Sequence, residues 1–141
     1  MLLRFKKTRD GCVLTCTRAD GSVDVQRSSQ SAFFALHDLL HYALESTLGM
    51  RRAFLGLLAG GWNFRTFADH DDARYQSMPA EALAAEHLVA SLSRHFSGGA
   101  WEDPELLALW SEEINAELAL ELNNAGVAPY HATAEQLAAV C

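Results

Sequence analysis

The first thirty residues alternate between apolar and polar positions, the pattern of β-strands that bury one face. Three short segments of this kind, LLRF, CVLTCT and SVDVQ, are separated by the turn sequences RDG and ADG. Asp-Gly favours tight hairpin turns because glycine adopts the positive φ that these turns require. We therefore predict a three-stranded antiparallel meander over residues 1–30. Three short strands need a partner layer, so one face should pack on the rest of the chain.

Apolar residues then recur at helical spacing through most of residues 31–141. We predict helices over about 32–48, 50–59, 79–96 and 104–124, and a short last helix that begins at the capping-box sequence TAEQ, residues 133–136. Glycines are expected to end these helices, at Gly49, Gly60-Gly61, Gly98-Gly99 and Gly126. The aromatic and acidic segment 62–78 is predicted as a loop.

The predicted fold class is therefore α+β, mainly α, with the meander packed on a bundle of four or five helices. We expect a single domain over residues 1–141, since this length suffices for one compact core. No apolar run is long enough to cross a bilayer, and the first charge comes at Arg4, too early for a signal peptide. A cytoplasmic location without membrane contact is the expectation.

The net charge of −7 is unevenly distributed along the chain. Residues 1–30 carry a net charge of +3, whereas residues 101–141 contain eight acidic residues and no lysine or arginine. This acidic surface argues against binding of a nucleic-acid backbone, which requires clustered cations. The basic strands could contact an acidic partner or the acidic half of their own chain.

The predicted helix over residues 104–124 has two apolar sides. One stripe contains Leu107, Trp110, Ile114 and Leu118, and the other contains Leu109, Ala116 and Leu120. A helix with two apolar sides is buried on both, either within the bundle or at a subunit contact. A homodimer through this helix is therefore one expectation, and a protein-interaction module with no catalytic activity is another.

The candidate chemistry lies in the first predicted helix, in the sequence FFALHDLLHYALE. Leu36, Leu40, Ala43 and Thr47 lie on one side of this helix and are expected to face the core. His37 and His41 lie on a second, largely apolar side, so we expect both to be at least partly buried. Buried imidazoles need a partner for each nitrogen, because an unsatisfied polar group is costly.

A divalent metal would satisfy both histidines, since imidazoles at positions i and i+4 of a helix can converge on one ion. Asp38 is a candidate acceptor that orients a ligand. Glu45 is a less favourable third ligand, because its rise from His37 along the helix is roughly 12 Å. Better third ligands come from LAAEHLV in the next long helix: Glu86 and His87, with Glu81 behind them.

The metal hypothesis names Zn²⁺ or another divalent ion on His37, His41, Glu86 and His87, with no organic cofactor. If the site is catalytic, we expect metal-assisted hydrolysis of an unidentified small molecule, with Glu45 or Glu86 moving the proton. A zinc-protease motif is not expected, because the residue after His37 is aspartate rather than glutamate.

The same residues fit two alternatives to a metal site. The two histidines could form a buried hydrogen-bond network with Asp38, Glu45 or Tyr42 that only stabilises the helix. They could also form a metal-free acid–base site.

Two other groups of reactive residues carry weaker signals. Cys12 and Cys16 lie about 13 Å apart on one strand face and are expected to be ordinary reduced thiols, as is Cys141. His70 lies among three aspartates in ADHDDARY, residues 68–75. This segment could bind a cation or cover the histidine helix, although such acidic runs are more often simply solvated.

Two segments together resemble a bacterial family of small uncharacterised proteins. They are HDLLHYALESTLGMRRAFLGLLAGGW at residues 37–62 and PAEALAAEH at residues 79–87. The co-occurrence of these segments fits a site shared by His37, His41, Glu86 and His87. The pentapeptide HDLLH also resembles the H-D-x-x-H element of the coenzyme Q biosynthesis scaffold proteins, which implies a zinc site. That longer motif continues with a glutamate twelve residues after its second histidine, where this chain has Ala53.

Overall fold

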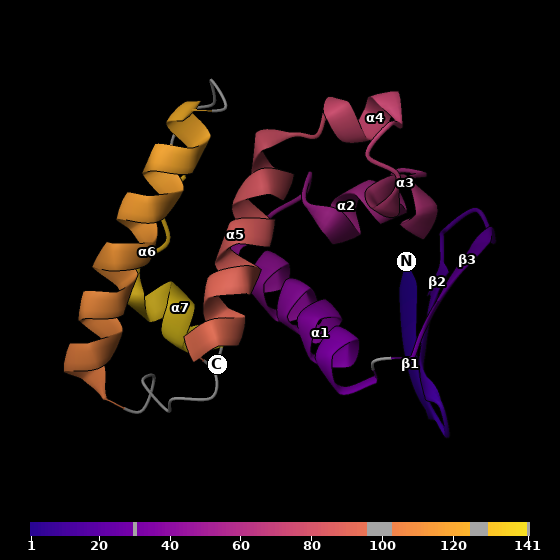
Figure 1. The fold of residues 1–141 in the computed structure, drawn as a ribbon, viewed down its shortest axis with the longest axis horizontal. Helices are drawn as coiled ribbons and strands as arrows, with labels where there is room; N and C mark the ends of the chain where they lie inside the picture. Colours follow the sequence, from indigo (N-terminus) through magenta and orange to yellow (C-terminus); the bar gives the residue numbers. More distant parts are fainter. Residues whose placement is uncertain (30, 96–102, 125–129, 141) are drawn as a thin grey trace.

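The computed structural model of the chain describes residues 1–29, 31–95, 103–124 and 130–140. An antiparallel sheet with strand order β1-β2-β3 is followed by helices, which confirms the predicted fold class (Figure 1). The strands are β1 (Leu2–Thr8), β2 (Gly11–Thr17) and β3 (Val23–Ser28). The helices are α1 (Ser31–Leu48), α2 (Phe54–Ala59), α3 (Phe64–Ala68), α4 (Ala73–Gln76), α5 (Ala80–His95), α6 (Pro104–Asn124) and α7 (Ala134–Val140). The predicted helix ends at Gly98-Gly99 and Gly126, and Cys141, lie outside the described residues.

The inner face of the sheet packs on the short helices that follow α1. Leu14 and Cys16 of β2 are buried against Phe54 and Leu58 of α2 and against Phe64 of α3. The other predicted thiol, Cys12, is also buried, and both cysteines are free. This first core therefore joins the sheet to α2 and α3.

The second core lies among the four longer helical elements. α1 packs against α5 and α7, and α6 packs on the other side of α5 and against α7 (Figure 1). Its apolar residues include Leu40 and Leu44 of α1, Leu88 and Leu92 of α5, Trp110, Ile114 and Leu118 of α6, and Leu137 of α7. Within the described part of the chain, no helix is both long enough and apolar enough to cross a membrane. α1 is thus a central helix, between the sheet and the rest of the bundle.

The buried side of α1 differs from the predicted one. Leu40 is buried as expected, but Leu36 and Thr47 are exposed. The buried side of α1 instead includes His41 together with Leu40 and Leu44, and α5 packs on this side. The histidine side of the helix is therefore a principal buried side, and the opposite side faces solvent.

α1 ends at Gly49, as predicted. This glycine has a φ of +67°, and the N–H of Met50 donates to the carbonyl of Glu45 over 2.9 Å, the hydrogen bond of a Schellman helix end. The prediction that the next helix starts at residue 50 is wrong, since α2 begins at Phe54. The backbone N–H groups of Arg51 and Arg52 donate to the Glu81 side chain of α5 instead of entering a helix.

α2 passes unusually close to the turn that precedes it. A Cβ atom on Gly56 would lie 1.9 Å from the carbonyl oxygen of Arg51, a distance that real Cβ contacts do not reach. The helix can therefore occupy this position only because residue 56 has no side chain.

The segment 62–78, predicted as a loop, contains two short helices. Asn63 caps α3, since its side chain accepts hydrogen bonds from the N–H and the hydroxyl of Thr66. Asp72 caps α4 by accepting from the N–H of Arg74. Both caps are residues that favour helix starts, but the helices are too short to show a periodic pattern.

Two polar side chains attach this segment to the sheet. Arg18, just after β2, donates to the carbonyl groups of Leu58 and Trp62. Asp24 of β3 accepts from the N–H of Phe64 over 2.7 Å. These bonds fix the end of α2 and the start of α3 relative to the sheet.

Candidate metal centre

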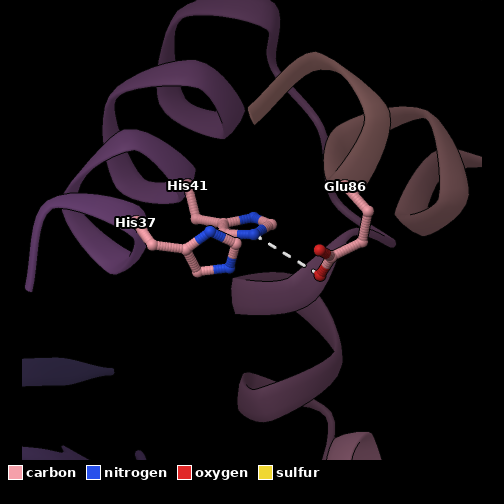
Figure 2. A group of neighbouring side chains, drawn as sticks. All are labelled: His37, His41 and Glu86. Atoms are coloured by element: carbon pink, nitrogen blue, oxygen red, sulfur yellow. Dashed lines mark ion pairs between the residues drawn. The ribbon is translucent and has the colours of Figure 1, made fainter. Parts of the chain in front are cut away.

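Two neighbouring turns of α1 and one turn of α5 bring three possible ligands together. His37 and His41 lie four residues apart on α1, with their ring centroids 4.8 Å apart, and Glu86 approaches from α5 (Figure 2). One donor atom from each of the three residues lies within 4.8 Å of the others. Two of the three are the predicted histidine pair, and the third is a predicted ligand from the next long helix.

The imidazole of His41 is enclosed between two carboxylates. Its side chain is 1% exposed, and Nδ1 lies 3.1 Å from Oε1 of Glu45. Its Nε2 lies 3.4 Å from Oε1 of Glu86 and has no hydrogen-bond partner among the described residues. The two ring nitrogens therefore face different environments, one hydrogen-bonded and the other directed at the candidate ligand cluster.

Glu45 is held in place from its other oxygen. Its side chain is 3% exposed, and Oε2 accepts a hydrogen bond from the N–H of Leu55 over 2.9 Å. Both carboxylate oxygens therefore have a partner, one on α1 itself and one at the start of α2. Glu45 is therefore placed to fix the orientation of His41, and it does not belong to the group of three possible ligands.

The charges around His41 favour its protonated form when no ion is bound. Burial by itself would lower the pKa of His41, but the carboxylates of Glu45 and Glu86 outweigh it and raise the pKa to about 9. Burial also opposes ionisation of Glu86, yet His41 and His37 hold the pKa of this carboxyl below its ordinary value. A positive charge between the two helices, carried by the protonated His41, is thus electrostatically favoured.

His37 is the more accessible of the two imidazoles. Its burial and the neighbouring His41 lower its pKa, although Glu86 acts in the opposite direction. A histidine with a lowered pKa is neutral at physiological pH, and the neutral imidazole is the form that binds metals.

A small cleft opens beside these residues. It has a volume of about 260 Å³, and its polar lining includes His37, Asp38 and Glu86. Asp38 is 6% exposed, and burial raises the pKa of its carboxyl to about 6, with His41 acting in the opposite direction. The structure thus places the predicted orienting residue Asp38 in the cleft wall.

The aromatic side chains of the cleft come mainly from elements that the sequence did not connect with the histidines. Phe54 of α2 contacts His41, with a ring centroid distance of 5.0 Å. Phe64 and Phe67 of α3 lie around Phe54, and Phe34 of α1 completes the lining. Helical spacing places Phe34 on the side of α1 that carries the histidines, and the sequence signal for Phe64 and Phe67 is the aromatic content of residues 62–78.

The remaining candidates lie away from this cluster. The predicted ligand His87 is turned towards α6, and its Nε2 lies 3.5 Å from Oε2 of Glu117. Adjacent helical residues point about 100° apart, so α5 cannot direct both Glu86 and His87 at α1.

The other two candidates have partners elsewhere: Glu81 binds the Arg51 and Arg52 backbone, and His70 stacks on Tyr75. Of the four predicted ligands, the structure therefore brings His37, His41 and Glu86 together, whereas His87 faces α6.

No model of a known protein family, no curated protein and no solved structure matches this chain.

Proposed function

We propose that this protein binds a divalent metal ion, with Zn²⁺ the preferred candidate, through His37, His41 and Glu86. Two imidazoles and one carboxylate form a ligand set that zinc uses when a coordination position is left open for a substrate. The same ligand set also suits other divalent ions such as Fe²⁺. The identity of the metal therefore has to be measured, because the ligands alone do not determine it.

The pairing of His41 with Glu45 is the observation that carries this proposal. A metal-binding histidine commonly donates its second N–H to a carboxylate, which fixes both the tautomer and the ring orientation. Here Glu45 accepts from Nδ1 over 3.1 Å, so that Nε2 is directed at Glu86. Two ligand atoms about 2.1 Å from a tetrahedral ion lie roughly 3.4 Å apart. The separation of His41 Nε2 from Glu86 Oε1 is 3.4 Å.

Metal-assisted hydrolysis is the chemistry we propose for such a site. A divalent ion supplies Lewis-acid activation of a carbonyl or phosphoryl oxygen. Of the two carboxylates predicted to move a proton, Glu45 already has a partner for each oxygen, whereas Glu86 lies on the cleft. When Glu86 binds the ion, Asp38 is the other carboxylate in the cleft lining, and we propose it as the proton acceptor.

A non-enzymatic role has one specific observation in its favour. With a pKa of about 9, His41 is protonated at neutral pH in the metal-free protein and pairs with Glu45 and Glu86. This ion pair would satisfy the buried imidazole without any metal. In that case the histidine cluster would serve only to lock α1 against α2 and α5.

Metal analysis of protein purified without a histidine tag separates these two functions. We expect about one zinc per chain after equilibration with Zn²⁺ and removal of excess metal, and a zinc-dependent rise in melting temperature. The variants His37→Gln and Glu86→Gln should each weaken zinc binding by at least roughly tenfold.

Matched controls are available on the surface. His131→Gln and Glu113→Gln make the same chemical changes at exposed positions outside the cluster and should leave zinc binding unchanged. Less than about 0.1 metal per chain, with no effect of zinc on the melting temperature, would contradict the metal proposal and favour the structural ion pair.

A further inference from the structure

The aromatic lining of the cleft specifies the kind of molecule that would reach the ion. The cleft lies beside the ligand cluster, and four phenylalanines contribute to its wall: Phe34, Phe54, Phe64 and Phe67. Phe54 and Phe64 are nearly buried, at 8% exposure each, so the apolar wall is part of the packed structure. A fixed apolar wall next to a ligand cluster recognises a molecule with one apolar end and one polar end.

The wall is held by contacts on both of its sides. Phe54 lies between His41 and Phe67, with ring centroid distances of 5.0 and 4.7 Å. Phe64 is held by the hydrogen bond from its N–H to Asp24 of the sheet. The wall is therefore preorganised, so an incoming ring would not have to order these side chains itself.

The size of the cleft limits the ligand. A volume of about 260 Å³ lies just below the range of roughly 300–1,000 Å³ that is usual for drug-sized ligands. A single six-membered ring with a small polar group suits this space, and aromatic rings favour edge-to-face or offset contacts with such walls.

We propose that the cleft binds small compounds that carry a single aromatic-sized apolar group next to an oxygen-donor head group, with the head group on the metal and the ring against the phenylalanines. This inference rests on the proposed metal site. As a substrate class, it corresponds to small aromatic esters or amides rather than to peptides or other extended chains.

Two hydroxamic acids that share one chelating head group test the proposal in the cobalt-loaded protein. Benzohydroxamate carries a phenyl ring and acetohydroxamate carries a methyl group, and the absorption bands of Co²⁺ report the binding of either compound. We expect benzohydroxamate to bind roughly 30-fold more tightly, which corresponds to burial of about 80 Å² of additional apolar surface.

A cleft-filling variant provides the matched test. Ala68 is an exposed residue of the cleft lining, so Ala68→Leu should narrow the cleft without removing a core contact. We expect this variant to bind Co²⁺ normally and to reduce the preference for benzohydroxamate to less than about threefold. The control Ala108→Leu, at an exposed position of α6, should keep the full preference.

The possible failures can be told apart. Equal affinity for the two hydroxamates in cobalt-loaded wild-type protein would overturn the ligand proposal and leave the metal site standing. Undiminished benzohydroxamate binding to metal-free protein, measured by calorimetry, would overturn the role of the ion in recognition. Absence of Co²⁺ and Zn²⁺ binding would overturn both this inference and the proposed function.

Discussion

Glu45 orients His41, because each of its carboxylate oxygens accepts one hydrogen bond. One oxygen accepts from His41 Nδ1 over 3.1 Å, and the other accepts from the N–H of Leu55 over 2.9 Å. The carboxylate therefore connects the ring to the first turn of α2. The tautomer and the angle of His41 thus depend on a residue that does not belong to the ligand cluster.

Replacement of Glu45 by glutamine tests this dependence. Glutamine keeps the size of the side chain but removes its charge, and its N–H₂ group cannot accept a hydrogen bond. We expect Glu45→Gln to weaken zinc binding by roughly 10- to 100-fold, the usual effect of losing such an orienting carboxylate. Isothermal titration calorimetry with Zn²⁺ measures this change. An affinity equal to that of the control Glu113→Gln would show that Glu45 has no influence on the site.

The protonation of His41 predicts how the metal-free protein responds to pH. Its pKa is 6.5 in the unfolded chain and about 9 in the folded protein, so the folded state binds the extra proton between these values. The extra proton on His41 therefore stabilises the folded state, fully below pH 6.5, and this stabilisation is lost as the pH rises through about 9. The pKa difference corresponds to a contribution on the order of 3 kcal/mol.

Urea unfolding of the metal-free protein at several pH values measures this contribution. The wild type should lose free energy of unfolding between neutral pH and about pH 9, whereas His41→Gln should lose markedly less over the same interval. Parallel curves for the two proteins would show that His41 does not carry the extra proton.

At the level of single elements, the cleft wall depends on the short helix α3. Asn63 caps this helix by accepting from the N–H of Thr66 over 3.0 Å and from its hydroxyl over 3.1 Å. Thr66 is 1% exposed, so loss of the cap leaves a buried hydroxyl with a missing partner. The position of Phe64 and Phe67 in the cleft follows from this local arrangement.

We expect Asn63→Ala to lower the free energy of unfolding by about 1 kcal/mol, the usual cost of losing a helix cap. Chemical denaturation followed by circular dichroism measures the change. Asn123→Ala, at an exposed position near the end of α6, is the control and should change stability by less than about 0.5 kcal/mol. A loss of equal size in both variants would indicate that the Asn63 cap has no special importance.

The sequence predicts the elements that have strong local signals. The two Asp-Gly turns define the three strands, and Gly49 ends α1 with the expected positive φ. The capping box at α7 is confirmed in full, since Thr133 and Gln136 each accept from the N–H of the other. These features succeed because neighbouring residues alone determine them.

Features that depend on distant contacts are harder to predict. The late start of α2 follows from Glu81 binding the Arg51 and Arg52 backbone, which no local pattern reveals. The rotation of α1 is another example, because both of its sides are largely apolar and the packing of other elements on α1, chiefly α5, selects the side that is buried. In the candidate site, helical spacing predicts the histidine pair, whereas the choice of Glu86 over His87 depends on the orientation of α5.

At the scale of the whole molecule, the basic and acidic parts of the sequence lie at opposite ends of the structure. The basic sheet lies at one end, and the acidic helix α6 lies at the other, beyond α1 and α5 (Figure 1). The second apolar stripe of α6 faces outward, with Leu109 64% and Leu120 63% exposed. This exposed stripe is the surface we propose for a homodimer.

Light scattering coupled to size-exclusion chromatography tests the dimer. We expect a dimer for the wild type, and a monomer with an unchanged helical spectrum for the double variant Leu109→Lys/Leu120→Lys, because two charges would be buried at the contact. The control Val23→Lys places a charge at another exposed apolar position, on the sheet, and should remain dimeric. A wild-type monomer at all concentrations would remove this role for α6.

Because α2 lies so close to Arg51, the residue at position 56 restricts which sequences can form the site. A methyl group at Gly56 would force α2 away from the turn, since its carbon would lie 1.9 Å from the Arg51 carbonyl oxygen. The N–H of Leu55 would move with the helix and release one oxygen of Glu45, and Glu45 in turn positions His41. A residue that touches neither the ligands nor the cleft therefore limits substitution as strictly as a ligand does. Related chains that retain this site should have glycine at this position even where the surrounding apolar residues vary.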